Sequence, residues 1–334
     1  MIAGYQVYAA NPHAVSRYRG RHRAARAKSD RGDANVLADL VRTDRHNHRQ
    51  VAGDSPLAEA IKVLARAHQS LIWTRQRHVN ALRSALREFY PGALIALGAQ
   101  LAEPEALAVL ELAPTPELGR RLTRAAVRQA LVRAGRRRNL QARVVAVHDA
   151  LAVPQLAAPE PVEAAYCQVV GALVAMLRCL NGQVDALEEQ LTVRFAAHPD
   201  AVIVRSLPGL GAVLGARVLG EFGDDPHRYA TAKGRKAFAG TAPVTRSSGL
   251  RTTVVARAAC NQRLVDACYL WAFAALTASP GARRCYDTHR ARGQTHHQAL
   301  RALGNRLVGI LHGCLARRVA YQEQVAWPAA DAAA

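Results

Sequence analysis

Apolar residues recur at helical spacing over much of the chain. From Leu57 to Tyr90 they advance in steps of three and four, and Pro91 and Gly92 follow directly. This pattern predicts one long helix that ends at the proline and glycine. Residues 105–150 have a similar helical pattern, broken by prolines, so we expect shorter helices there.

A second long helix is predicted after a linker that runs from Pro154 to Pro161. Its apolar residues alternate steps of four and three: Tyr166, Val170, Leu173, Leu177, Leu180, Val184, Leu187 and Leu191. Such a heptad stripe is typical of a coiled coil. The alternative is an ordinary amphipathic helix packed within its own domain, which Gly182 slightly favours. We expect the helix to pair, with the helix at 57–90 or with a second subunit.

The two ends of the chain have different patterns. Residues 2–12 alternate enough to predict a strand, followed by a basic loop and a helix from Asp30 whose inner face is formed by Ala34, Leu37 and Val41. One strand and one helix cannot bury a core alone, so this segment is expected to be part of an α/β domain. Residues 202–224 predict a helix, a tight turn and a helix. A loop at 237–250 and helices at 261–277 and 296–320 are expected to follow.

The net charge of the chain indicates a class of binding partner. The chain has 334 residues, with 45 Lys and Arg against 25 Asp and Glu, a net charge of +20. Such an excess is typical of a protein that binds a polyanion, most simply nucleic acid. The basic residues concentrate in two clusters, Arg17, Arg19, Arg21, Arg23, Arg26 and Lys28, and then Arg120, Arg121, Arg124 and Arg128 within a run that extends to Arg143.

Cysteine usage and hydropathy indicate the compartment. None of the six cysteines forms a CxxC pair, so zinc-ribbon and thioredoxin sites are excluded. No signal peptide and no apolar run long enough to span a membrane is evident in the sequence. We expect reduced thiols in a cytoplasmic, nucleoid-associated protein without a membrane partner.

Three short motifs are candidates for chemistry. Asp30 and Asp33 share a helix face and could hold a divalent ion, although a helix cap at Asp30 and a favourable dipole interaction of Asp33 explain them better when they are considered alone. LPGLG at 207–211 places Gly209 and Gly211 in a turn similar to a helix-hairpin-helix phosphate site; a plain packing turn is the alternative. APVTRSSG at 242–249 places serines beside Arg246 and Arg251, or is simply a polar loop.

Four longer strings, in order, resemble the IS-one-ten family of insertion-sequence transposases, which includes Piv-type invertases. They are SRYRGRHRAARAKSDRGDA with VLADLVRTDRHNHR, LPGLGAVLGARVLGEFGD, AFAGTAPVTRSSG, and SPGARRCYDTHRARGQTHHQALRALGNRL. The resemblance covers nearly the whole chain. It implies a mainly α fold: the end of a ribonuclease-H-like (RuvC-like) α/β domain at 1–52, long coiled-coil helices within 53–200, a helical transposase domain with a helix-hairpin-helix-like motif at 201–325, and a tail at 326–334.

The resemblance also implies a mechanism. Members bind Mg²⁺ through four carboxylates in the order DEDD and form a covalent serine–DNA link. A structured bridge RNA guides them, and they assemble as dimers or tetramers through the coiled coil. The motif match places the third and fourth carboxylates at Asp30 and Asp33, and the nucleophile at Ser248 rather than Ser247.

Residues 1–29 contain no Asp or Glu for the first two carboxylates. We therefore expect either an N-terminally truncated copy or a true start codon further upstream. An enzyme that recombines DNA is one reading. The alternative is a catalytically inactive remnant that still binds nucleic acid.

Overall fold

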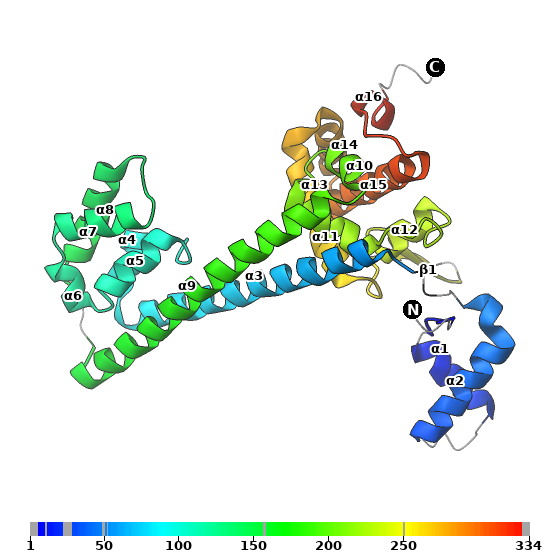
Figure 1. Ribbon diagram of the computed structural model, residues 1–334, viewed down its shortest axis with the longest axis horizontal. Coiled ribbons are helices and arrows are strands. Elements are labelled where there is room, and N and C mark those ends of the chain that lie inside the picture. The colour runs from blue at the N-terminus through cyan, green and yellow to red at the C-terminus, as the bar shows by residue number, and fades with distance from the viewer. Residues whose placement is uncertain are drawn as a thin grey trace. The chain divides into compact units, whose positions relative to one another are not determined.

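The computed structural model describes residues 6–10, 12–22, 29–48, 51, 53–155, 158–249 and 251–328. Over these residues the protein is mainly α-helical, with one two-stranded sheet, which confirms the predicted fold class at this level (Figure 1). The chain divides into two compact units. The first unit comprises residues 1–62 and 197–334, and the second comprises residues 63–196.

The second unit is built on two long helices. They are α3, Pro56–Phe89, whose first turn belongs to the first unit, and α9, Glu160–Ala196. Three contacts define their pairing: His68 with Glu188 at 3.7 Å, Arg75 with Asn181 at 3.2 Å, and the ring of Phe89 stacked on that of Tyr166. As the residue number rises on α3, that of its partner falls on α9, so the two helices are antiparallel.

The heptad stripe of α9 is buried within the chain. Val170, Leu177 and Leu191 are each 0 % exposed. Of the two pairings expected from the sequence, the structure therefore shows the one with the helix at 57–90. Three polar residues, His68, Arg75 and His78, interrupt the apolar stripe of α3 itself. His68 and Arg75 meet polar partners on α9, which keeps the pair in register, whereas His78 lies 2.9 Å from the Thr74 carbonyl of its own helix.

One helix in the described part of the chain, α9, is long and apolar enough to cross a membrane by length and composition alone. Core helices of water-soluble proteins pass the same test. The inner stripe of α9 packs on protein rather than lipid, and the absence of a membrane partner stays a prediction.

Gly182 occupies an exposed interior position of α9, and a Cβ added there would meet no atom within 4 Å. We predict that Gly182→Ala stabilises the protein by about 1 kcal/mol, because alanine loses less backbone entropy on forming helix. Chemical denaturation followed by circular dichroism measures this change. A destabilised variant would mean that α9 is distorted at this position.

Five short helices complete the second unit. They are α4, Pro91–Leu97; α5, Pro104–Leu112; α6, Pro116–Arg121; α7, Arg124–Arg133; and α8, Leu140–Ala152. Thr115 and Thr123 cap α6 and α7 through their hydroxyls. The helices bury Leu107, Leu131 and Val147 against Leu86 of α3, forming one contiguous core.

The N-terminal segment differs from the sequence prediction. Of residues 6–10 only Tyr8 forms an isolated bridge, so the predicted strand is absent from the described part. The expected basic loop is helical over α1, Pro12–His22, which packs on α2, Asp30–Asp44, and a 3₁₀ turn, Arg45–Asn47, follows. The Tyr18 hydroxyl donates to Asp39 of α2 at 2.8 Å, a tertiary contact that residue pattern alone does not reveal.

The buried face of α2 is also not the predicted one. Leu37 is 40 % exposed, whereas Leu40 is 3 % exposed. The reason is the position of α1. It contacts α2 through Asp33 and Asp39, which turns the Leu40 side inward and leaves Ala34 in solvent.

The rest of the first unit is built on α13, Gln262–Ala278, and α15, His296–Arg317. Around them lie α10, Ala201–Ser206; α11, Ala212–Phe222; α12, Ala232–Phe238; α14, Pro280–Ala291; and α16, Glu323–Ala326. Trp271, Phe222 and Leu307 are almost fully buried between them.

The loop predicted at 237–250 is wrong in part. Its second half forms β1, Val244–Ser248, paired antiparallel with β2, Arg251–Val255. Two residues, 249 and 250, connect the strands, and Gly249 adopts a φ of 55°. The run of β-branched residues from Thr252 to Val255 favours a strand and was the missed signal.

Candidate nucleophile and nucleic-acid interface

The register of the hairpin separates the two candidate serines. Side chains alternate between the faces of a strand, and cross-strand partners share a face. Ser248 is opposite Arg251, and Arg246 is opposite Thr253, so both arginines lie on the Ser248 face. Ser247 lies on the other face, where its hydroxyl is 3.2 Å from that of Thr252. Of the two serines, Ser248 is therefore the one flanked by guanidinium groups.

This face of the hairpin suits a phosphodiester. Ser248, Arg246 and Arg251 are all exposed to solvent. Guanidinium groups form charge-assisted hydrogen bonds to phosphate oxygens and stabilise charge that develops on them. Among the described residues no side chain hydrogen-bonds to Ser248, so the hairpin by itself shows no general base.

Asp30 and Asp33 are placed by the start of α2. Ser29, not Asp30, is the N-cap, and its hydroxyl accepts from the Gly32 amide at 3.2 Å. Asp30 is the first helical residue, where it complements the helix dipole. The Asp33 carboxylate forms an ion pair with Arg19 at 2.6 Å.

The Asp30 and Asp33 donor set does not fit Mg²⁺ as described. This ion needs near-octahedral oxygen ligation, and here one of two carboxylates is already neutralised by Arg19. Within the described ranges no group of three or more His, Cys, Asp or Glu side chains is arranged to hold a metal ion. Neither aspartate forms a described polar contact with Ser248.

The basic clusters are partly neutralised in the folded chain. In the second unit Arg124 pairs with Asp149 at 3.1 Å, Arg136 with Glu105 at 2.8 Å, and Arg121 with Glu117. These acids lie outside the stretch 120–143, which itself contains none. The exposed arginines for which the described contacts show no acidic partner are Arg120, Arg128, Arg133, Arg137 and Arg138.

The N-terminal cluster is divided in the same way. Arg17 is exposed, and Arg19 is committed to Asp33. Arg23, Arg26 and Lys28 lie outside the described residues, as does the side chain of Arg21. The phosphate-binding role of this cluster stays a prediction.

The LPGLG turn is packed rather than open. Gly209 has a φ of 82°, and a Cβ there would lie 2.7 Å from the backbone nitrogen of Ala275 on α13. The indole of Trp271 donates to the Pro208 carbonyl at 2.9 Å. This geometry gives Gly209 a packing role, whereas Gly211, the N-cap residue of α11, is exposed.

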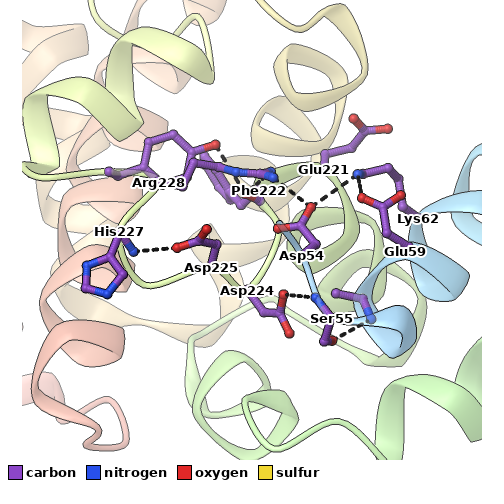
Figure 2. Close-up of polar contacts among 12 residues, drawn as sticks. Asp54, Ser55, Glu59, Lys62, Glu221, Phe222, Asp224, Asp225, His227 and Arg228 are labelled. Atoms are coloured by element: carbon purple, nitrogen blue, oxygen red, sulfur yellow. Dashed lines mark hydrogen bonds and ion pairs between the residues drawn. The ribbon is translucent and has the colours of Figure 1, made fainter. Parts of the chain in front are cut away.

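A buried polar cluster joins the start of α3 to the loop after α11, and the sequence did not indicate it. Figure 2 shows Asp54 between Lys62 and Arg228, at 3.3 and 2.8 Å. The Asp54 side chain is 0 % exposed. Gly223 has a φ of 71° and lies so close to Asp54 and Arg228 that there is no room for a side chain at position 223. This cluster fixes the first turn of α3 on the first unit.

Asp224 supports the same junction. Its carboxylate accepts from the Ser55 amide at 2.9 Å and lies 3.2 Å from His198 (Figure 2 shows the Ser55 bond). Burial by itself raises the pKa of Asp224, but these hydrogen bonds outweigh it and the pKa is lowered. Its contribution to stability is complete above the ordinary pKa of an aspartate and is lost as the pH falls through the lowered value.

His296 and Cys268 of the first unit are packed within the fold. His296 Nδ1 lies 2.8 Å from the Tyr286 hydroxyl, and its ring packs edge-on to that of His297. Cys268 is buried, which raises the pKa of its thiol to about 12. All six cysteines are free thiols, and Cys179 on α9 is exposed.

Comparison with known proteins gives matches along the chain. A family model described as "Transposase" matches residues 2–91, and one described as "Transposase IS116/IS110/IS902 family" matches residues 201–287. The mini-circle putative transposase for IS117 of Streptomyces coelicolor is 44 % identical over 98 % of this chain and 80 % of its own length.

Two further relatives are insertion-element proteins. An uncharacterized 43.6 kDa protein of IS110 from Streptomyces coelicolor is 32 % identical over 90 % of this chain and 73 % of its own length. An uncharacterized 42 kDa protein of IS900 from Mycobacterium paratuberculosis is 31 % identical over 92 % of this chain and 75 % of its own length.

Proposed function

Because the chain belongs to the IS116/IS110/IS902 family of transposases, which is the IS-one-ten family that its sequence motifs resemble, we propose that it cleaves and exchanges DNA strands through Ser248. The register of the hairpin is the observation that supports this assignment: it places Arg246 and Arg251 on the Ser248 face and Ser247 on the other. The IS117 relative carries the name putative transposase, and the serine step is what the family resemblance implies, to which the hairpin geometry adds support.

The proposed step is a transesterification. The Ser248 oxygen attacks phosphorus, a serine–phosphate ester forms, and the bond to one deoxyribose oxygen breaks. The serine proton is lost and the leaving oxygen gains one, so the exchange is balanced. Arg246 and Arg251 stabilise the charge on the non-bridging oxygens. A deoxyribose hydroxyl of another strand then attacks the ester, restores Ser248 and joins the strands.

Mg²⁺ is part of the proposal only as an expectation from the family. When bound, such an ion supplies charge neutralisation at a phosphate. Asp30 and Asp33 are the residues of this chain that would contribute oxygens, once Asp33 is released from Arg19. Since the described donor set does not fit the ion, no step is derived through it.

We propose DNA and a structured guide RNA as partners, which places the protein at the nucleoid. The support is the net charge of +20 and the exposed arginines for which the described contacts show no acidic partner, Arg120, Arg128, Arg133, Arg137 and Arg138. Phosphate contacts release counterions, so duplex affinity should fall with salt by a log–log slope of about −0.9 per contact.

We propose that the protein self-associates through a second stripe of α9, which is exposed to solvent, whereas the heptad stripe is buried against α3. We call this exposed stripe the outer stripe. It also alternates steps of three and four, and every member is exposed: Val162, Ala165, Val169, Ala172, Met176, Cys179, Gln183, Ala186, Gln190 and Val193. Small apolar residues at heptad spacing allow a second helix to approach closely.

We predict that a parallel pair of α9 helices brings Cys179 next to its counterpart. Mild oxidation should then give a disulfide-linked dimer that Cys179→Ser abolishes. Met176→Glu should dissociate the oligomer in sedimentation, because an unpaired charge would be buried. Ala164→Glu, exposed and off both stripes, is the matched control. A monomeric wild-type chain, or dimers unaffected by Met176→Glu, would exclude the outer stripe as the interface.

A second candidate function is binding of nucleic acid without strand cleavage. The ion pair between Arg19 and Asp33 favours it, since it leaves the described donor set unfit for a metal ion. The two functions are separated by incubating residues 1–334 with DNA, Mg²⁺ and a cognate RNA, followed by denaturing electrophoresis. Covalent protein–DNA adducts through Ser248 support the transposase. Salt-sensitive binding without adducts supports the second candidate.

A further inference from the structure

A groove in the first unit is not used by the proposed reaction. It has a volume of about 530 Å³ and lies between α12, α15 and the segment 319–326 that follows α15. Three of its lining residues are cations, Lys236, Arg306 and Arg317, and the described lining contains no carboxylate. The remaining wall is largely apolar, with Ile310 and Tyr321 among its members. A groove with this lining fits an anion that also has an apolar part.

Two glycines of α15 shape the floor. A Cβ added at Gly309 would lie 2.7 Å from Cε and 3.0 Å from Nζ of Lys236, so the lysine side chain rests directly on this glycine. One turn further, the Arg317 guanidinium lies over Gly313 and donates to its carbonyl at 3.3 Å. Both cations therefore lie close to the helix backbone, and a side chain at position 309 would displace Lys236.

The three cations differ in whether their charged groups already have partners within the protein. The Arg306 guanidinium donates to the Ala326 carbonyl at 3.0 Å and stacks over the Trp327 ring, so it fixes the C-terminal segment as a wall. For Lys236 and Arg317 the described contacts show no acidic partner. Their charges are available to a ligand.

The pKa of the neighbouring His312 is also affected by the positive charges at the groove. Burial lowers the pKa of His312, and the charges of Arg235 and Lys236 lower it further. Two acids lie near the groove without lining it: Asp200 is paired with Arg318, and Glu323 accepts from the Tyr321 and Ser279 hydroxyls and the Gly281 amide. The charge balance around the groove therefore favours an anion.

We propose that this groove binds one nucleotide of a single-stranded nucleic acid, with its phosphate on Lys236 and Arg317 and its base against Ile310 and Tyr321. Lysine and arginine form charge-assisted hydrogen bonds to phosphate, and bases pack on apolar and aromatic side chains. The proposal rests on the proposed function only for the choice of a nucleic acid as the source of the nucleotide.

The test is photo-crosslinking of the full chain to an oligonucleotide of about 12 residues that contains 4-thiouridine, a length within the range that single-strand sites cover. Mass spectrometry should find cross-linked peptides from residues 306–328. Lys236→Gln and Gly309→Ala should each weaken this cross-link about tenfold. Gly309→Ala introduces a residue that favours helix and should not lower the melting temperature. Gly182→Ala, in open space on α9, is the matched control and should cross-link like the wild type.

Competition distinguishes the possible ligands. A nucleoside monophosphate should displace the groove cross-link at concentrations at which inorganic phosphate does not. Equal competition by inorganic phosphate, or cross-links only outside residues 306–328 and unchanged in both variants, would overturn the proposal. Ser248→Ala should leave the groove cross-link intact, so failure of the Ser248 chemistry and failure of the groove are separate results.

Discussion

Ser248→Ala is expected to abolish covalent protein–DNA adducts, with a loss of at least about three orders of magnitude in the rate of adduct formation, because of the two candidate serines only Ser248 shares a face with both arginines. Ser247→Ala is expected to retain most of the rate. Its hydroxyl lies on the opposite face beside Thr252, so its loss removes one exposed hydrogen bond and no group near the phosphate. Adducts are counted by denaturing electrophoresis of protein bound to labelled DNA.

The assay is run in parallel on the chain itself and on a hybrid, in which the N-terminal part of the IS117 relative replaces residues 1–52 and residues 53–334 are unchanged. Arg246→Gln and Arg251→Gln should each slow adduct formation in the hybrid, by about tenfold to a hundredfold, while Ser248 is still present. If Ser247→Ala removes the adducts and Ser248→Ala does not, the assignment of the nucleophile is wrong.

The long helices could be predicted because their ends are marked in the sequence. Ser55 and Pro56 start α3, and the proline and glycine after Tyr90 end it. The heptad stripe of α9 was equally clear, but a stripe does not name its partner. Only the cross-helix contacts, such as Arg75 with Asn181, identify α3 as the helix that covers it.

The errors arise where a distant residue decides the local structure. The buried face of α2 depends on α1, whose helix is fixed by Tyr18 contacting a residue 21 positions away. The hairpin that carries Ser248 was predicted as a loop, because serines and a glycine hid a short strand in front of a β-branched run. Its register, which separates Ser248 from Ser247, is not encoded in any local spacing.

The buried cluster at Asp54 is the extreme case, since Asp54 and Arg228 are 174 residues apart. We predict that Asp54→Asn lowers the free energy of unfolding by about 3–5 kcal/mol. The substitution keeps the shape of the side chain but removes its charge. Lys62 and Arg228, whose side chains are only 17 % and 18 % exposed, would then lose the carboxylate that compensates them.

The control is the other carboxylate on Lys62. Glu59 lies 2.5 Å from the same ammonium, but its side chain is 50 % exposed. Glu59→Gln should therefore cost at most about 1 kcal/mol, because solvent screens an exposed pair. Urea denaturation followed by circular dichroism measures both variants. A double-mutant cycle of Asp54→Asn with Arg228→Gln should show a coupling of at least about 1 kcal/mol, since each residue is the main partner of the other. Equal, small losses from the Asp54 and Glu59 variants would show that the first turn of α3 is not fixed on the first unit by buried charge, and that the packing of Gly220 against Lys62 holds it instead.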